Sequence, residues 1–164
     1  MIDTVGTFLL SKYTAEHSMK KGGVIINITA NLHYNGTLLQ SHAGTAKAGV
    51  DALTKHMAVE LGPRKIRVVG ISPGAIEGTE GFERLSTADM KKEGAAFVSI
   101  IPLQRVGTKV DIADSCLFVA SEGASYMTGV TILVDGGMNL TAANMTMMSP
   151  DIQKSYPNMG KSKL

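Results

Sequence analysis

The stretch SHAGTAKAGVDALTKHMAVE, residues 41–60, decides the fold because it predicts a long helix with one face in the core. Small residues crowd its first half, and small side chains let a helix approach another backbone closely. Larger apolar residues then recur at the spacing of one helix face, at Val50, Leu53, Met57 and Leu61. Lys47 therefore projects from a surface that is built for close contact.

Lys47 has two interpretations on this stretch alone. It is either a solvated lysine paired with Asp51 one helical turn further on, or a functional group on the contact surface. A surface pair of this kind contributes only about 0.3 kcal/mol, so it would explain little. The sequence on either side has to decide between the two.

The flanking sequence predicts an α/β fold with a parallel sheet. Short β-branched runs predict buried strands at residues 24–29, 66–72 and 130–134, and helical patterns cover residues 4–19 and 109–121. Residues 79–98 have weak periodicity and predict one or two short helices. Strands that alternate with helices are typical of a parallel sheet covered on both faces. The first strand would have one open side, so the architecture looks like half of a larger sheet.

Two of these helices show apolar stripes that predict their buried faces. The first stripe consists of Phe8, Leu9, Tyr13 and Met19. The second stripe consists of Val110, Ala113, Leu117 and Ala120. After the last strand, Asp135-Gly136-Gly137 predicts a tight turn rather than a ligand site.

Composition places the chain among globular proteins of one domain. It has 164 residues, of which 44% are hydrophobic and 18% are charged, with a mean hydropathy of +0.11. A net charge of +2 with dispersed basic residues argues against nucleic acid as a partner, and no apolar run is long enough to cross a membrane. Cys116 is the only cysteine and the histidines lack metal-ligand spacing, so we expect neither a disulfide nor a zinc site.

The chain ends in Ser162, Lys163 and Leu164, and Ser-Lys-Leu at a C-terminus is an address read by the peroxisomal import receptor. A given tripeptide occurs there by chance roughly once in 8,000 sequences of equally frequent residues, so the match is specific. Residues 141–164 are rich in Met, Asn and Ser and predict an irregular tail that carries this signal. We therefore expect a peroxisomal protein.

In order and spacing, these elements resemble the C-terminal half of the short-chain dehydrogenases/reductases. The resemblance covers residues 1–140 and is carried by VIINIT, the Ala-Lys-Ala centre of the long helix, IRVVGISPG and TGVTILVDGG. It implies the C-terminal part of a Rossmann-like doubly wound parallel sheet that binds NAD or NADP. The family's N-terminal glycine-rich βαβ half holds the cofactor pyrophosphate, but no TGxxxGxG run occurs here. We therefore expect a partial reductase domain, from a fragment, a truncated isoform or an incomplete gene model.

The resemblance gives Lys47 a role, which is to bond the nicotinamide ribose and tune proton transfer. The family's catalytic tyrosine is expected four residues earlier, where this sequence has Ala43, and its serine is expected at Ala30. Neither alanine can donate a proton, so reduction of a ketone would lack its acid. A conjugated dienoyl thioester poses a different problem, because hydride addition gives a dienolate that is protonated on carbon, and a held water can supply that proton.

Within the family, the run Ile2-Asp3-Thr4-Val5-Gly6-Thr7-Phe8, together with Ala43, Gly44 and Lys47, resembles the peroxisomal 2,4-dienoyl-CoA reductases. That resemblance implies NADPH-dependent reduction of 2,4-dienoyl-CoA to 3-enoyl-CoA in fatty acid β-oxidation. Asp3 and Lys47 would position the catalytic water. Taken alone, an aspartate near a chain start is more often a solvated helix cap.

The resemblance also implies contacts with cofactor and substrate beyond Lys47. The cofactor segment is Pro73, Gly74, Ala75, Ile76, Glu77, Gly78 and Thr79. It follows the second strand, at the end of a sheet where α/β proteins bind ligands, and in the family it lies against the nicotinamide. Arg84 would meet the acyl-CoA substrate, although an exposed helix arginine explains it nearly as well. The family further implies a homo-oligomer for the full-length protein.

Two alternatives stay open at this point. One is another short-chain reductase of acyl thioesters, of the 3-oxoacyl type, which would need an acid near Ala43. His42 is a poor substitute, because on a helix it points about 100° away from Ala43. The other alternative is a truncated, non-catalytic product that acts only in assembly.

Overall fold

A computed structural model describes residues 2–37, 40–85 and 94–141. Within them, three parallel strands form one sheet in the order β1 (Gly23–Ile28), β2 (Ile66–Pro73) and β3 (Thr131–Val134). Gly23 lies opposite Ile66 and Gly70 lies opposite Thr131. The predicted α/β class, the parallel sheet and the three strands are confirmed, and each strand boundary lies within one residue of its prediction.

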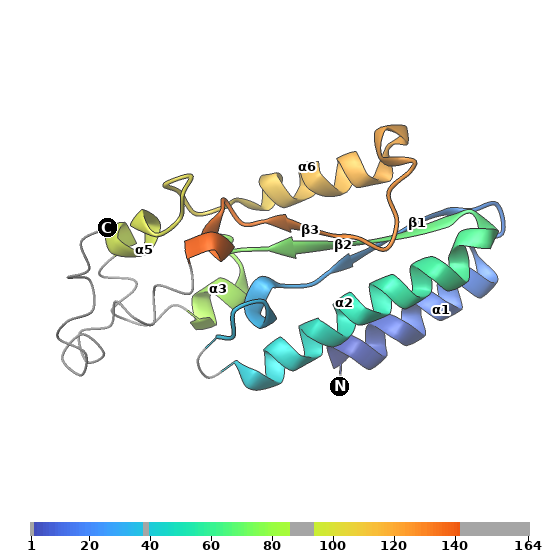
Figure 1. The fold of residues 1–164 in the computed structure, drawn as a ribbon, viewed down its shortest axis with the longest axis horizontal. Coiled ribbons are helices and arrows are strands. Elements are labelled where there is room, and N and C mark those ends of the chain that lie inside the picture. The colour runs from blue at the N-terminus through green and yellow to red at the C-terminus, as the bar shows by residue number, and fades with distance from the viewer. Residues whose placement is uncertain (1, 38–39, 86–93, 142–164) are drawn as a thin grey trace, which may run out of the picture.

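The helices lie on both faces of this sheet (Figure 1). Five α-helices are described: α1 (Thr7–His17), α2 (Ser41–Leu61), α3 (Glu80–Leu85), α5 (Gly94–Ser99) and α6 (Lys109–Ala120). A π-helical turn, η1 (Ile2–Gly6), precedes α1, and three short 3₁₀ turns are η2 (Asn31–His33), η3 (Gly62–Arg64) and η4 (Glu122–Ala124). Helices α1 and α2 cover one face, and α6 covers the other. None of the described helices is long and apolar enough to cross a membrane.

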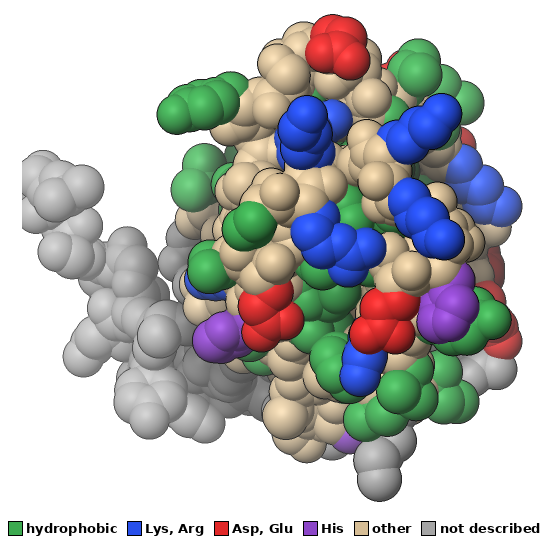
Figure 2. Space-filling view, turned by 90° about the vertical axis from the view of Figure 1, so that its right-hand side faces the viewer, with side chains coloured by type: hydrophobic (Ala, Val, Ile, Leu, Met, Phe, Trp, Pro, Cys, Tyr) green, Lys and Arg blue, Asp and Glu red, His purple; other side chains and the backbone are tan. Residues whose placement is uncertain are grey.

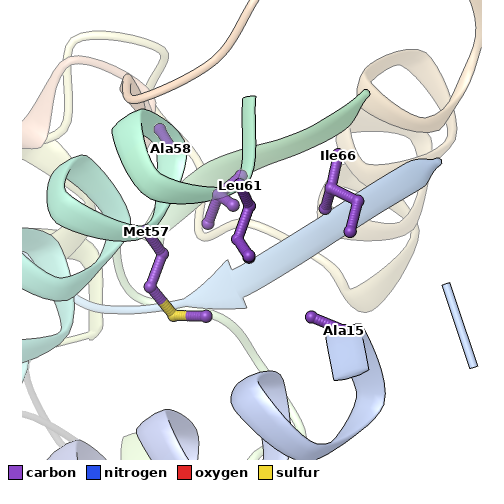
Figure 3. Packing of buried hydrophobic residues seen from close by; sticks show 6 residues of the cluster. Ala15, Met57, Ala58, Leu61 and Ile66 are labelled. Atoms are coloured by element: carbon purple, nitrogen blue, oxygen red, sulfur yellow. The ribbon is translucent and has the colours of Figure 1, made fainter. Parts of the chain in front are cut away.

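Helix α2 packs on the sheet through the face that its sequence predicts. Val50, Met57 and Leu61 are buried and Leu53 is partly buried. Together with Ala15 of α1 and Ile66 and Val68 of β2, Met57, Ala58 and Leu61 form one core cluster (Figure 3). Burying an aliphatic side chain of this size contributes about 2 kcal/mol, so this cluster fixes α2 against β2.

Helix α6 packs through a different face from the one that its sequence predicts. Val110 and Leu117 of the predicted stripe are 64% and 69% exposed. Ile112, Cys116 and Val119 instead pack on Val69 and Ile71 of β2, and burial raises the pKa of the Cys116 thiol. Apolar residues lie on most sides of this helix, so periodicity alone does not single out the packed face.

The predicted stripe of α1 is wrong for three of its four residues; the fourth, Met19, packs against the core cluster. Phe8, Leu9 and Tyr13 are 41%, 57% and 63% exposed, whereas the small residues Ser11 and Ala15 face the core. Ala15 packs with Met57, Ala58 and Leu61 of α2, so the side of α1 that carries Ser11 and Ala15 is the one turned to α2.

Strand β1 is less buried than its apolar sequence predicts. Asn27 is the only buried residue of β1, and Ile28 is 47% exposed. Thr29, the first residue after the strand, is buried as well. The cause is position, because β1 is an edge strand of the described sheet and pairs only with β2. The expectation of one open side on the first strand is therefore confirmed.

The two ends of the sheet, where the strands begin and where they end, carry different polar residues. Where β1 and β2 begin, two loops carry Lys20, Lys21, Arg64 and Lys65, and Figure 2 shows basic side chains gathered on this face, with acidic ones between them. Arg64 donates to the carbonyl of Ala15, so it helps to hold α1 in place. Where the strands end, Asp135 accepts hydrogen bonds from Gly137 N at 2.9 Å and Asn139 N at 2.8 Å, which confirms the predicted turn.

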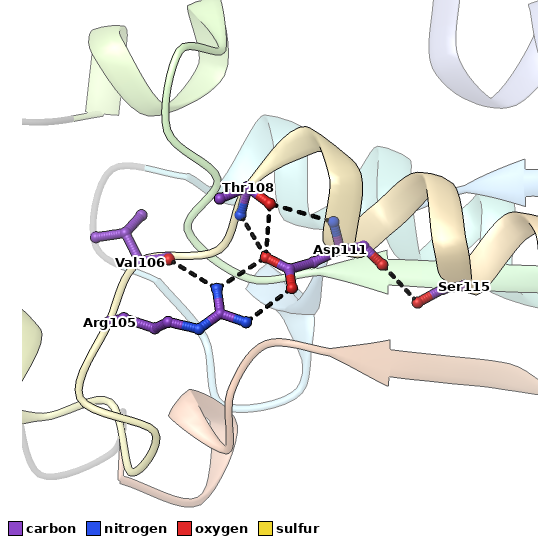
Figure 4. Close-up of polar contacts among 5 residues, drawn as sticks. All are labelled: Arg105, Val106, Thr108, Asp111 and Ser115. Carbon is purple, nitrogen blue, oxygen red and sulfur yellow. Dashed lines mark hydrogen bonds and ion pairs between the residues drawn. The ribbon is translucent and has the colours of Figure 1, made fainter.

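The start of α6 is fixed by a capping box between Thr108 and Asp111. The Thr108 hydroxyl accepts from Asp111 N, and the Asp111 carboxylate accepts from Thr108 N at 2.7 Å (Figure 4). Arg105 donates to both oxygens of this carboxylate, at 2.7 and 2.8 Å. The Arg105 guanidinium, and after it Thr108, hold the pKa of the Asp111 carboxyl well below its usual range.

Asp111→Asn is expected to lower the melting temperature near neutral pH, because the amide loses the charge that accepts these bonds. The pKa of Asp111 is depressed in the folded chain, so its stabilisation is present above the unfolded value of about 4 and is lost as the pH falls. The gap in melting temperature between variant and unmodified protein should therefore narrow from about pH 6 to about pH 3. Thermal unfolding followed by circular dichroism measures this gap, with exposed Asp114→Asn on the same helix as control. An equal gap at both pH values would contradict the assignment.

Candidate functional site

Lys47 lies at the carboxyl end of β1, where α2 crosses the sheet. Its ammonium Nζ donates to the carbonyl of Ile28, the last residue of β1, at 3.2 Å. Its own carbonyl accepts from the Thr29 hydroxyl at 3.2 Å. Two contacts thus tie this lysine to the strand end, and its side chain is 22% exposed.

Asp3 is the acidic partner of Lys47. The Asp3 carboxylate lies 3.7 Å from Lys47 Nζ, and the Asp3 side chain is 45% exposed. The structure thus brings together the two residues that the family resemblance implies, although 44 positions of sequence separate them. The simpler interpretation, in which Lys47 pairs with Asp51, is wrong, because Asp51 has other partners.

Asp51 is buried under α2 and collects three donors from elsewhere in the fold. Tyr34 Oη donates to Asp51 Oδ2 at 3.0 Å, His33 Nε2 lies 3.0 Å from the same oxygen, and Thr131 Oγ1 donates to Oδ1 at 3.2 Å. This cluster joins α2 to η2 and β3 and fixes the helix one turn beyond Lys47. Sequence reasoning missed it; the available signal was an aspartate at core spacing beside Val50 and Thr54.

The Tyr34 phenol is poorly suited to replace the missing tyrosine. Burial, and after it the neighbouring Asp51 carboxylate, raise the pKa of Tyr34 to about 12. A proton donor works best when its pKa lies near the working pH. Ala43 is half-buried one turn before Lys47, and His42 is exposed, so the structure gives neither position an acid that faces Lys47.

A second polar contact holds α2 further along the sheet. Asn27 of β1 donates to the Thr54 hydroxyl at 2.9 Å, and that hydroxyl donates to the Val50 carbonyl at 2.9 Å. Both side chains are buried. Because a buried polar group without a partner costs stability, this pair favours one register of α2 on β1.

The cofactor segment predicted at Pro73–Thr79 leaves the carboxyl end of β2, next to the strand end that holds Lys47. Its backbone is held by Gly107, whose N–H donates to Ala75 O at 3.0 Å and whose carbonyl accepts from Glu77 N at 2.9 Å. Gly74 lies against Asp135, where an added Cβ would come within 2.6 Å of the Asp135 side chain. Glycine is therefore required there by packing.

The end of this segment also starts α3. The Thr79 hydroxyl donates to Ile76 O at 2.8 Å and accepts from Phe82 N at 3.3 Å. Arg84, the predicted substrate contact, belongs to α3, but its side chain lies outside the described residues. The targeting residues Ser162, Lys163 and Leu164 lie outside them as well.

A cavity of about 430 Å³ adjoins the cofactor segment on the side of α6. Its lining is mostly aliphatic, with Ile76, Ile101, Pro102, Leu103, Leu133 and Val134, and it also includes Arg105 and Asp111. Asp3 and Lys47 do not line it. The described residues also contain no group of three or more side chains that could hold a metal ion.

Comparisons with known proteins show which family this chain resembles. The profile of the family described as enoyl-(acyl carrier protein) reductase matches residues 1–139. A peroxisomal 2,4-dienoyl-CoA reductase from Mus musculus is 49% identical over 148 aligned residues, and the match covers 87% of this chain and 49% of the mouse protein. The corresponding protein of Danio rerio is 51% identical over 144 residues, which cover 87% of this chain and 47% of the fish protein.

The fold of this chain is also similar to about half of a larger solved structure. A 7α-hydroxysteroid dehydrogenase complexed with NADH and a 7-oxo bile acid superposes with a TM-score of 0.75 and 33% identity. The match covers 82% of this chain and 52% of that structure. The chain thus spans about half the length of the curated relatives it matches.

Proposed function

The chain belongs to the short-chain dehydrogenase/reductase family, and we propose that it supplies the catalytic half of an NADPH-dependent 2,4-dienoyl-CoA reductase. The observation that carries the proposal is the Asp3–Lys47 pair, 3.7 Å apart, in a site with alanine one turn before the lysine. The names of the mouse and zebrafish relatives support it, because both are called peroxisomal 2,4-dienoyl-CoA reductases.

The residues at the strand ends fit the nicotinamide end of a dinucleotide. Lys47 at the end of β1 and the Pro73–Thr79 segment at the end of β2 lie on adjacent strands, at the edge where such sheets bind ligands. The Lys47 ammonium has three N–H donors and is partly exposed, so it can bond ribose hydroxyls while it keeps Ile28 and Asp3 as neighbours. The family's glycine-rich pyrophosphate-binding run does not occur in this sequence, so the fit concerns the nicotinamide end alone.

NADPH, when bound, supplies a hydride to the far carbon of the conjugated diene. The resulting negative charge spreads over a dienolate that includes the thioester oxygen. The Lys47 ammonium stabilises this charge, and the Asp3 carboxylate with Lys47 holds the water that protonates the carbon next to the thioester. No tyrosine is required, because the proton goes to carbon and not to a carbonyl oxygen.

The substrate class and the cellular address are parts of the same proposal. Arg84 on α3 would meet the acyl-CoA, since a guanidinium binds phosphate or thioester oxygen well. Ser162, Lys163 and Leu164 would be read by the peroxisomal import receptor, and the peroxisomal relatives support that address. The full-length enzyme would be a homo-oligomer; exposed apolar residues on α1, such as Leu9 and Leu10, support this.

The test uses a hybrid protein in which the N-terminal half of the mouse relative precedes Ile2 of this chain. We expect the hybrid to oxidise NADPH with a 2,4-dienoyl-CoA at least about 100-fold faster than with a 3-oxoacyl-CoA, because only ketone reduction needs the missing acid. The decrease in dienoyl and NADPH absorbance measures both rates, and the mouse enzyme is the positive control. Faster turnover of the 3-oxoacyl thioester would favour the other class of reductase.

A further inference from the structure

Thr4 forms a hydrogen bond between η1 and α2, beside the Asp3–Lys47 ion pair. Its hydroxyl Oγ1 donates to the carbonyl of Ala46 at 2.9 Å, across 42 positions of sequence. The side chain is half-buried at this contact. A carbonyl inside a helix has a second lone pair free for such a donor, so the bond does not require α2 to open.

Gly49 provides the space in which the Thr4 side chain lies. A Cβ added at Gly49 would come within 2.9 Å of both Thr4 Cγ2 and Thr4 Oγ1, closer than such atoms approach in proteins. The hydroxyl and the methyl group of Thr4 thus meet α2 at two places one turn apart, Ala46 and Gly49. Together these two contacts fix where η1 lies along the axis of α2 and how closely it approaches that helix.

Other contacts of η1 hold it less firmly. The π-helical turn has no buried residue, Ile2 is 89% exposed and Val5 is 45% exposed. Single π turns occur often at functional sites, because they place a side chain where a regular helix would not. Apolar burial therefore does little to set the position of the Asp3 carboxylate.

Thr4 follows Asp3 directly, and Ala46 precedes Lys47 directly. The Thr4–Ala46 hydrogen bond therefore controls how closely the Asp3 carboxylate approaches the Lys47 ammonium. The two charged groups are 3.7 Å apart. We propose that Thr4 is a positioning residue that holds Asp3 against Lys47, and that Gly49 is the small residue that admits it. The expected effect of this contact on catalysis rests on the proposed function, whereas its effect on the Asp3–Lys47 distance does not.

The experiment compares matched variants of the hybrid protein. Thr4→Val keeps the shape of the side chain and removes the hydroxyl, whereas Thr4→Ser keeps the hydroxyl. Gly49→Ala displaces Thr4 without removing a polar group, and Gly6→Ala is its control, because a Cβ at Gly6 would meet no atom within 4 Å. The readouts are kcat and KM with dienoyl-CoA and NADPH, and the Asp3–Lys47 separation in crystal structures.

Thr4→Val and Gly49→Ala should each lower kcat about 10-fold or more, with KM for NADPH changed less than about 3-fold. Both should move the two charges beyond about 4 Å, the limit of an ion pair. Thr4→Ser should restore most of kcat, and Gly6→Ala should leave it unchanged. If Thr4→Val folds with the pair still in contact and kcat intact, the proposal is overturned. If Thr4→Val fails to fold, Gly49→Ala is compared with Gly6→Ala instead. A Gly49→Ala variant with the Asp3–Lys47 pair still in contact and kcat intact would then overturn the proposal.

The two proposals fail separately. A hybrid that turns over no dienoyl thioester would remove the proposed function, while the crystallographic separation in Thr4→Val would still support or overturn the positioning role. A hybrid that is fully active with all four variants would keep the proposed function and remove Thr4 from it. A loss of kcat that Thr4→Ser does not restore would also contradict a role for the hydroxyl.

Discussion

The 164-residue chain by itself is expected to bind NADPH at least about 100-fold more weakly than the hybrid protein, a difference of about 2.7 kcal/mol. In Rossmann-type folds the pyrophosphate lies on a glycine-rich turn and a helix N-terminus, and this sequence has no TGxxxGxG run. On the proposed function, Lys47 and the Pro73–Thr79 segment would meet only the nicotinamide end of the cofactor. Titration calorimetry on both proteins measures the two affinities.

The open edge of β1 adds a second expectation for the isolated chain. Backbone groups along an unpaired edge strand attract other chains, and β1 pairs only with β2 among the described residues. We expect light scattering to show association for the isolated chain that the hybrid suppresses. Tight NADPH binding by a well-behaved isolated chain would contradict both expectations. It would also count heavily against a non-catalytic product that acts only in assembly.

Asp3→Asn in the hybrid is expected to lower kcat about 100-fold, the usual range for loss of acid–base assistance. The amide keeps the shape of the side chain but loses the charge that lies 3.7 Å from Lys47 Nζ, so the water between substrate and protein is no longer oriented. KM for NADPH should change little, because the proposed ribose contact is made by Lys47. Steady-state kinetics with dienoyl-CoA measure both constants.

Two further variants sharpen this result. Glu16→Gln removes an exposed carboxylate from the neighbouring helix α1 and should leave kcat unchanged. Lys47→Met should lower kcat and also raise KM for NADPH, since it removes both the ribose donor and the partner of Asp3. Full turnover by Asp3→Asn would take Asp3 out of the mechanism and would leave Lys47 as a cofactor ligand alone.

Much of the fold could be predicted from local sequence. The β-branched runs of β1 and β2 and the apolar face of α2 are each a single strong pattern, and Gly62-Pro63 ends α2 where the sequence predicts. The packed faces of α1 and α6 could not be predicted in this way. Each helix offers more than one apolar face, and the choice depends on what the sheet presents: small residues of α1 meet α2, and Cys116 of α6 meets β2.

The candidate site could likewise be predicted only in part. Asp3 and Lys47 were predicted as partners only through resemblance to a family, because no local pattern links residues so far apart in sequence. The cluster around Asp51 was missed, since His33 and Tyr34 reach it from a loop whose path depends on tertiary structure. The Thr4–Ala46 bond was missed for the same reason. The one local sign of the cluster was Asp51 itself, a charged residue at a position that the helical spacing places in the core.

The most direct measurement is the fate of deuterium from NADPH that carries deuterium at both C4 positions, in a single turnover of the hybrid with 2,4-dienoyl-CoA. Mass spectrometry and NMR of the product should show one deuterium on the far carbon of the former diene, C5, and a double bond at C3. In D₂O with unlabelled NADPH, the deuterium should instead appear on C2, beside the thioester, where the held water delivers its proton. A product with its double bond at C2, or with no label from NADPH, would contradict the proposed role of Asp3 and Lys47.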